Sequence, residues 1–195
     1  MHRSKRHCFA SPVIEIKYGK LYLHRMHISP AQIEDIPLLV ALINSAYRGE
    51  ASKKGWTTEA DLLKGELRTD IPTLTEVIKR PQAVILKYTT TEGSITGSVF
   101  LETQERGLYL GMLSVSPLQQ ASGVGKQLMK AAEQHAKEND CPFIFMNVIS
   151  VRHELIAWYE KLGYQKTGET KPLSVDTRFG IPTQPLEFAI MEKKV

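Results

Sequence analysis

Cysteine and long apolar runs are scarce in this sequence of 195 residues. The two cysteines, Cys8 and Cys141, lie far apart and in no CxxC arrangement, so the chain has neither a disulfide framework nor a zinc-ligand spacing. We therefore expect no metal site and a reducing, cytoplasmic location. No stretch of about 18 consecutive apolar residues occurs, and no apolar run of signal-peptide length follows the basic first residues, so we expect no membrane partner.

Composition and charge are those of an ordinary globular protein. Charged residues make up 24% of the chain and hydrophobic residues 42%, and the length suits one domain with an independent core. We expect an N-terminal extension over residues 1–20 and a single domain over residues 21–195. The formal net charge of +4 suits an enzyme that attracts a polyanionic cofactor, but it also suits a weak nucleic-acid surface.

Apolar periodicity and turn residues predict the elements of the first half of the chain. In chain order these are a strand over 21–28, a helix from about 34 to 46, a loop over 47–57, a short helix that Thr58 and Asp61 open as a capping box, and a short helix over 72–79. Three strands, over 83–88, 94–102 and 108–115, then follow with short connections, which predict an antiparallel meander.

The second half of the chain alternates helix and strand. The pattern predicts a helix over 123–137, a strand over 142–148, a helix over 151–162, a strand from Tyr164 onwards and a last strand over 188–191. Residues after Lys171 are too rich in proline to assign further. We therefore expect an α/β (α+β) fold with one mixed sheet, in which an antiparallel N-terminal meander is followed by a βαβ-like half.

Two glycines, Gly123 and Gly125, stand immediately before the long helix and after a strand that ends near Pro117. Glycines at the start of a helix leave backbone N–H groups unshielded, and the helix dipole adds positive charge, so phosphate oxygens suit this position. A plain strand-to-helix turn is the alternative. The spacing matches neither a Walker loop nor the GxGxxG dinucleotide fingerprint.

The sequence Gln120-x-x-Gly123-x-Gly125 resembles the Q/R-x-x-G-x-G/A motif of the GNAT superfamily of N-acetyltransferases. Tyr159-x-x-x-Gly163-Tyr164 is similar to the closing motif of that family, and the resemblance covers roughly residues 21–170. It implies an enzyme that transfers an acetyl group from acetyl-CoA to a primary amine by direct attack. The acceptor would be a small molecule or a peptide. Family members often pair, which leaves a homodimer open.

The resemblance also implies which residues contact the co-substrate. The backbone of the loop would hold the pyrophosphate, and the strand end before it would pair with the pantetheine arm. The loop residues are Gln120, Ala121, Ser122, Gly123, Val124, Gly125 and Lys126, and the strand residues are Leu113, Ser114 and Val115. Arg152 stands where many members carry a cofactor-contacting asparagine. Tyr159 would be the acid that protonates the leaving thiolate, or alternatively a core residue packed with Trp158.

The resemblance assigns no general base, because Gly111 stands where some relatives place a glutamate. Glu102 is the base candidate by residue type, with Glu59 and His153 as further candidates, and each is alternatively a solvated or structural residue. The segment 46–59 lies where the family shapes its acceptor pocket. From it we expect substrate contacts by Tyr47, Arg48, Trp56 and Glu59.

Two other functions remain open at this point. The missing carboxylate base suits a non-catalytic acyl-CoA-binding regulatory module. The basic balance suits a nucleic-acid-binding protein, but the sequence contains no helix-turn-helix, zinc finger or aromatic RNA platform, so we expect no nucleic-acid partner.

Overall fold

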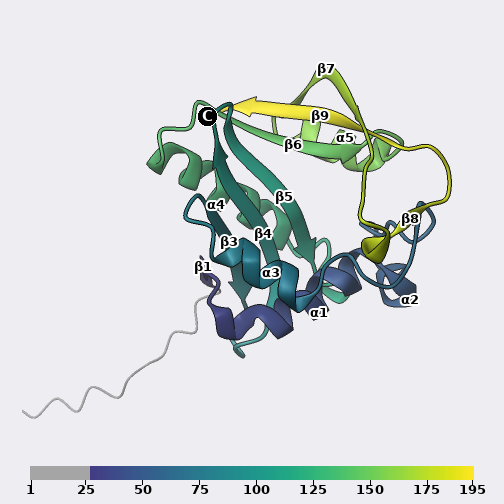
Figure 1. Cartoon of the computed structure of the whole chain (residues 1–195). Coiled ribbons are helices and arrows are strands. Elements are labelled where there is room, and N and C mark those ends of the chain that lie inside the picture. Colours follow the sequence, from purple (N-terminus) through teal and green to yellow (C-terminus); the bar gives the residue numbers. More distant parts are fainter. Residues whose placement is uncertain (1–26) are drawn as a thin grey trace, which may run out of the picture.

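A seven-stranded mixed sheet organises the protein in a computed structural model that describes residues 27–195 (Figure 1). Its strand order is β1-β3-β4-β5-β6-β9-β7, and β2 and β8 form a separate two-stranded ribbon. The strands are β1 (His27–Pro30), β2 (Leu63–Lys64), β3 (Ala83–Thr89), β4 (Ile95–Gln104), β5 (Gly107–Val115), β6 (Phe143–Ile149), β7 (Gln165–Pro172), β8 (Ile181–Pro182) and β9 (Glu187–Lys194). The helices are α1 (Ile36–Tyr47), α2 (Gly49–Ser52), α3 (Ile71–Ile78), α4 (Val124–Glu138) and α5 (His153–Glu160), with short 3-10 turns at Ile33–Asp35, Pro117–Gln119 and Thr177–Phe179.

The predicted antiparallel meander is confirmed. β1 pairs antiparallel with β3, β3 with β4, and β4 with β5. Of the strand expected over 21–28, only His27 and Ile28 fall within the described residues, and the expected extension over 1–20 lies outside them.

The βαβ-like half is also confirmed, because β5 and β6 are parallel and α4 connects them. β7, however, does not lie beside β6. β9, the last strand expected over 188–191, inserts between the two and pairs antiparallel with both, a position in the sheet that the sequence did not indicate.

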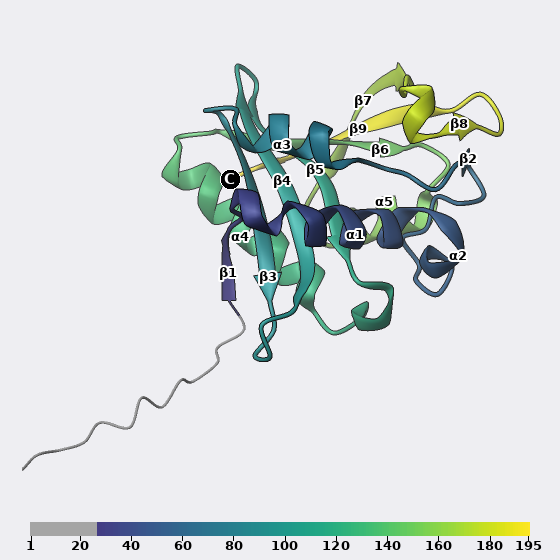
Figure 2. The same ribbon diagram turned by 60° about the horizontal axis from the view of Figure 1, so that its bottom comes forward.

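Helices cover both faces of the sheet (Figure 2). α1 and α3 bury Leu39, Ile43 and Leu74 against one face. On the other face α4 and α5 bury their apolar sides in the larger core cluster. Gly97 of β4 lies directly beneath α4, where an added Cβ would meet Val124 at 2.6 Å and Leu128 at 3.0 Å. The absence of a side chain at this position therefore sets how closely α4 approaches the sheet.

Two predictions about the segment after α1 were wrong. The helix expected from Thr58 does not form, because Leu63 and Lys64 are strand β2, paired with β8 more than a hundred residues later in the chain. The Thr58 hydroxyl instead accepts a hydrogen bond from the Ala60 backbone N–H at 3.2 Å. The region 47–57, expected to be a loop, contains the one-turn helix α2 (Gly49–Ser52). The β2 pairing is long-range and leaves no local signal in the sequence.

The sheet opens between β5 and β6. Their parallel pairing is limited to Leu108 with Ile144 and Tyr109 with Phe145, after which the strands diverge (Figure 1). Along the same part of β5 the register against β4 shifts, and Met112 has a φ of 46°, so a bulge bends the strand. The divergence leaves room between the carboxyl-terminal ends of these strands.

Candidate functional site

A pocket of about 340 Å³ lies beside this opening, between β5, the start of α4 and α5. It brings together most of the residues expected to contact the co-substrate: Leu113, Val115, Gln120, Ala121, Gly123, Val124, Gly125 and Lys126. We call it the loop pocket. Ser114, Ser122 and Arg152, which the sequence grouped with them, are not among its lining residues.

The start of α4 has the geometry of an anion site. Gly123 is the N-cap residue with φ of 89°, and no side chain caps the first turn of this 15-residue helix. A Cβ added at Gly123 would meet nothing within 4 Å, so the space in front of the helix end is open. Because the first N–H groups of a helix lack intrahelical partners and the dipole is positive there, this end favours a negatively charged group.

The opposite wall of the loop pocket is aromatic. Trp56 and Trp158 meet edge to face with ring centroids 5.9 Å apart, and Trp158 also contacts Tyr159 at 5.0 Å. Trp56 was expected at the acceptor site, but the structure places it in the loop pocket. The pocket therefore combines an anion-attracting end with an apolar flank.

Two side chains hold the Trp56–Thr57 segment over the loop pocket. The Gln120 Oε1 accepts from the Trp56 backbone N–H at 2.8 Å, and the Gln120 Nε2 donates to the Thr57 hydroxyl at 2.7 Å. Arg152, which is 5% exposed, donates to the backbone carbonyls of Trp56 at 3.0 Å and Thr57 at 3.3 Å, and its Nε donates to Glu154 at 2.8 Å. The guanidinium of Arg152 is thus engaged with the protein, in contrast to the cofactor contact expected from its position.

A second, smaller pocket of about 80 Å³ includes Leu113 and Tyr159 in its lining, as the loop pocket does. Its other polar lining residues are Tyr47, Glu59, Arg68, Tyr109, Asn147 and Arg152. We call it the polar pocket. The two pockets therefore meet at Tyr159 and at the bulged part of β5.

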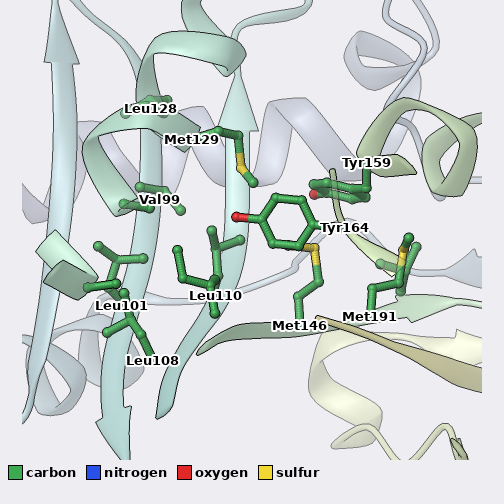
Figure 3. Packing of buried hydrophobic residues seen from close by; sticks show 14 of the residues in the cluster. Val99, Leu101, Leu108, Leu110, Leu128, Met129, Met146, Tyr159, Tyr164 and Met191 are labelled. Carbon is green, nitrogen blue, oxygen red and sulfur yellow. The ribbon is translucent and has the colours of Figure 1, made fainter. Parts of the chain in front are cut away.

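Tyr159 is buried, with 5% of its surface exposed, and packs against Tyr164 with ring centroids 6.0 Å apart (Figure 3). Its hydroxyl makes no hydrogen bond to any residue in the range 27–195. Burial raises the pKa of Tyr159 well above its usual value, and the neighbouring phenols of Tyr47 and Tyr164 raise it further, while Arg152 opposes them. The hydroxyl is therefore neutral at physiological pH.

Tyr47 closes the polar pocket from α1. Its hydroxyl donates to the backbone carbonyl of Leu113 at 2.7 Å, and burial together with the charge of Glu59 raises the pKa of Tyr47 to about 12. Glu59 is ion-paired with the buried Arg48, which also donates to the Phe179 carbonyl at 3.2 Å. Four residues were expected to contact the acceptor substrate. Of these, Tyr47 and Glu59 line the polar pocket, whereas Arg48 lines neither pocket and anchors the loop around the polar pocket.

The base candidates are placed differently. Glu102 lines neither pocket; it pairs with Arg80 at 3.1 Å and accepts from the Gln104 side chain at 2.8 Å. His153 is exposed at the start of α5 and also lines neither pocket. Glu59 is the one carboxylate that lines the polar pocket. The structure therefore does not bring Glu102 together with Tyr159.

Sequence reasoning missed Arg68, Tyr109 and Asn147, all of which line the polar pocket. Arg68 lies in the connection between β2 and α3, where no pattern marks it. Tyr109 lies on β5 and Asn147 on β6. The divergence of these two strands was not predictable, so no signal in the sequence indicated that the two residues line the same pocket.

Residues 27–195 lack two features that would point to other functions. This part of the chain has no helix of the length and apolarity that crossing a membrane requires. It also has no cluster of three or more His, Cys, Asp or Glu side chains able to hold a metal ion.

Comparisons with known proteins agree with the architecture. The profile of the acetyltransferase (GNAT) family matches residues 50–164. Acetyltransferase Atu2258 of Agrobacterium fabrum is 26% identical over 83 residues, which make up 43% of this chain and 59% of that relative, so the match spans less than two thirds of the relative's length.

Solved structures share the fold at low sequence identity. The ribosomal-protein-alanine N-acetyltransferase from Brucella melitensis superposes with a TM-score of 0.66 at 17% identity, over 87% of this chain and 100% of that one. The PaiA N-acetyltransferase from Thermoplasma acidophilum, solved in complex with coenzyme A, gives a TM-score of 0.62 at 19% identity, over 87% of this chain and 99% of that one.

Proposed function

The chain belongs to the acetyltransferase (GNAT) family, and from that premise we propose that it transfers an acetyl group from acetyl-CoA to a primary amine. The observation that carries this proposal is the position of Tyr159, which lines both the loop pocket and the polar pocket. A side chain between two adjoining pockets can serve a reaction in which one substrate enters from each side.

Two features of the loop pocket support acetyl-CoA as its ligand, an anion-attracting end and an apolar wall. The open space at Gly123 and the uncapped start of α4 suit a pyrophosphate, held by the backbone of residues 120–126. Leu113 and Val115, beside the apolar wall, would take the pantetheine arm. Arg152 and Gln120 support this site through the Trp56–Thr57 segment, as positioning residues.

Acetyl-CoA supplies an activated acetyl thioester to this site. The chain's own part would be to hold the acceptor amine in the polar pocket and to exclude water from the junction at Tyr159. As the amine nitrogen bonds to the acetyl carbon and the C–S bond breaks, the neutral Tyr159 hydroxyl would donate its proton to the leaving sulfur and then regain a proton from solvent. The amine proton would leave to solvent or to Glu59, the carboxylate of the polar pocket.

The proposal is tested by measuring CoA release from acetyl-CoA with a panel of primary amines: amino acids, polyamines, aminosugars and short peptides. We expect release above the amine-free rate with at least one class. Tight binding of acetyl-CoA without CoA release for any class of amine would contradict enzymatic transfer. It would favour the alternative function, a non-catalytic acyl-CoA-binding module.

A further inference from the structure

Arg68 is the one charged side chain of the polar pocket that has no counter-charge among residues 27–195. Glu59 is neutralised by Arg48, and Arg152 is paired with Glu154. Arg68 makes no ion pair there, and its guanidinium lies 5.7 Å from the centre of the Tyr47 ring. The pocket therefore carries one uncompensated positive charge.

The backbone at Arg68 is fixed in place by α1. The Asn44 Oδ1 accepts from the backbone N–H groups of Arg68 at 2.6 Å and Thr69 at 3.1 Å, and the Asn44 Nδ2 donates to the Thr69 carbonyl at 3.1 Å. Thr69 is itself buried, with 2% of its surface exposed. Three hydrogen bonds with the Asn44 side chain thus fix the backbone that carries Arg68, and the Arg68 guanidinium lies at the polar pocket without an ion-pair partner among residues 27–195.

Arg68 and Tyr159 both line the polar pocket. Burial raises the pKa values of Tyr47 and Tyr109, and the positive charge of Arg68, which lines the same pocket as both phenols, opposes that rise. A planar guanidinium with free donors binds a carboxylate through two parallel hydrogen bonds. The volume of about 80 Å³ suits a small acceptor.

We infer that the acceptor is a small amino acid, whose carboxylate binds Arg68 while its amine lies toward Tyr159. This inference rests on the proposed function and narrows its substrate class. Arg68 would be a specificity-determining residue, because a neutral or polycationic amine would leave its charge unpaired in the pocket.

The test compares kcat/KM for small amino acids and for their primary amides, such as glycine with glycinamide and β-alanine with β-alaninamide, in the native protein and in Arg68→Gln. The amide differs in the basicity of its amine as well as in charge, but this difference cancels when the acid-to-amide ratio is compared between the two proteins. We expect this ratio to fall by about ten- to a hundredfold in Arg68→Gln, as loss of a charge-assisted hydrogen bond predicts.

Two further variants complete the design. Arg68→Lys keeps the charge and should retain part of the preference for the acid. Arg106→Gln removes an arginine that pairs with Glu169 and Glu192 outside both pockets and should leave the ratio unchanged. The affinity for acetyl-CoA should stay the same in Arg68→Gln, Arg68→Lys and Arg106→Gln, because neither arginine lines the loop pocket.

An acid-to-amide ratio that is equal in the native protein and Arg68→Gln would overturn the inference while leaving the proposed function intact. Preference of the native protein for polyamines or C-terminally blocked peptides would also overturn the inference and leave the proposed function intact. Failure of the proposed function would look different, with no CoA released from any amine, and would overturn both.

Discussion

Tyr159 is the residue on which the proposed chemistry depends, since it lies where the two pockets meet. Replacing Tyr159 by phenylalanine should lower kcat by about 100-fold or more, in the range of general-acid contributions, and leave acetyl-CoA binding unchanged. Stability should change little, because no hydrogen bond from this hydroxyl exists within residues 27–195. Steady-state kinetics and thermal unfolding measure the two effects.

Tyr164→Phe is the matched control. The Tyr164 hydroxyl is buried without a hydrogen-bond partner among the described residues, and the Tyr164 ring contacts the ring of Tyr159. Removing a buried, unpaired hydroxyl should leave activity intact and stability equal or higher. Equal loss of kcat in both variants would assign the effect to disturbed packing and not to the Tyr159 proton.

The buried phenols also predict how stability depends on pH. Burial raises the pKa of Tyr47 to about 12, and those of Tyr159 and Tyr164 also rise, above the value of about 10 for an unfolded tyrosine. A group whose pKa is raised on folding contributes stability that is fully present below its unfolded pKa and is lost as the pH rises through the folded pKa.

We therefore expect the melting temperature to fall as the pH rises above about 10, and to fall less steeply in Tyr159→Phe, which lacks one of these groups. Thermal unfolding between about pH 8 and pH 11.5 measures both profiles. Parallel profiles for the two proteins would contradict this account of Tyr159.

At the scale of elements, the Trp56–Thr57 segment depends on two distant side chains. Replacing Arg152 by methionine should remove its hydrogen bonds to both carbonyls and lower the free energy of unfolding by about 2 to 4 kcal/mol. It should also raise the KM for acetyl-CoA, because Trp56 forms part of the loop pocket. Urea unfolding and steady-state kinetics measure the two effects.

Glu154→Gln is the control for that change. The Glu154 side chain is 56% exposed, so loss of its charge should cost less than about 1 kcal/mol and leave the KM unchanged. If Arg152→Met altered stability but not the KM, the segment would not support the acetyl-CoA site.

The elements differ in how well the sequence predicts them. Strong periodicity predicted α4, and short turn-like connections predicted the β3-β4-β5 meander. The β2-β8 ribbon and the insertion of β9 between β6 and β7 were not predictable, because such pairings join residues far apart in the chain. The loop at Gly123 could be placed from a local motif, whereas Glu102 was chosen by residue type and Arg48 by its place in the segment 46–59, and neither criterion carries information about side-chain direction or partners.

At the scale of the whole molecule, the site arises where three features coincide. The divergence of β5 from β6 opens the sheet, the bulge at Met112 bends β5, and the close approach of α4 at Gly97 brings the start of the helix to the opening. Each feature involves segments from a different part of the chain. The pocket is therefore a property of the complete sheet and its two helical layers.

The central claim, that the start of α4 binds the pyrophosphate of acetyl-CoA, is tested most directly by isothermal titration of acetyl-CoA into the native protein, Gly123→Asn and Gly123→Asp. Both replacements tolerate the left-handed conformation at this position and cap a helix about equally well, so they differ only in charge. We predict binding by the native protein and by Gly123→Asn, and affinity weaker by about tenfold or more in Gly123→Asp. Equal affinity in the two variants, or no binding by the native protein, would contradict the account.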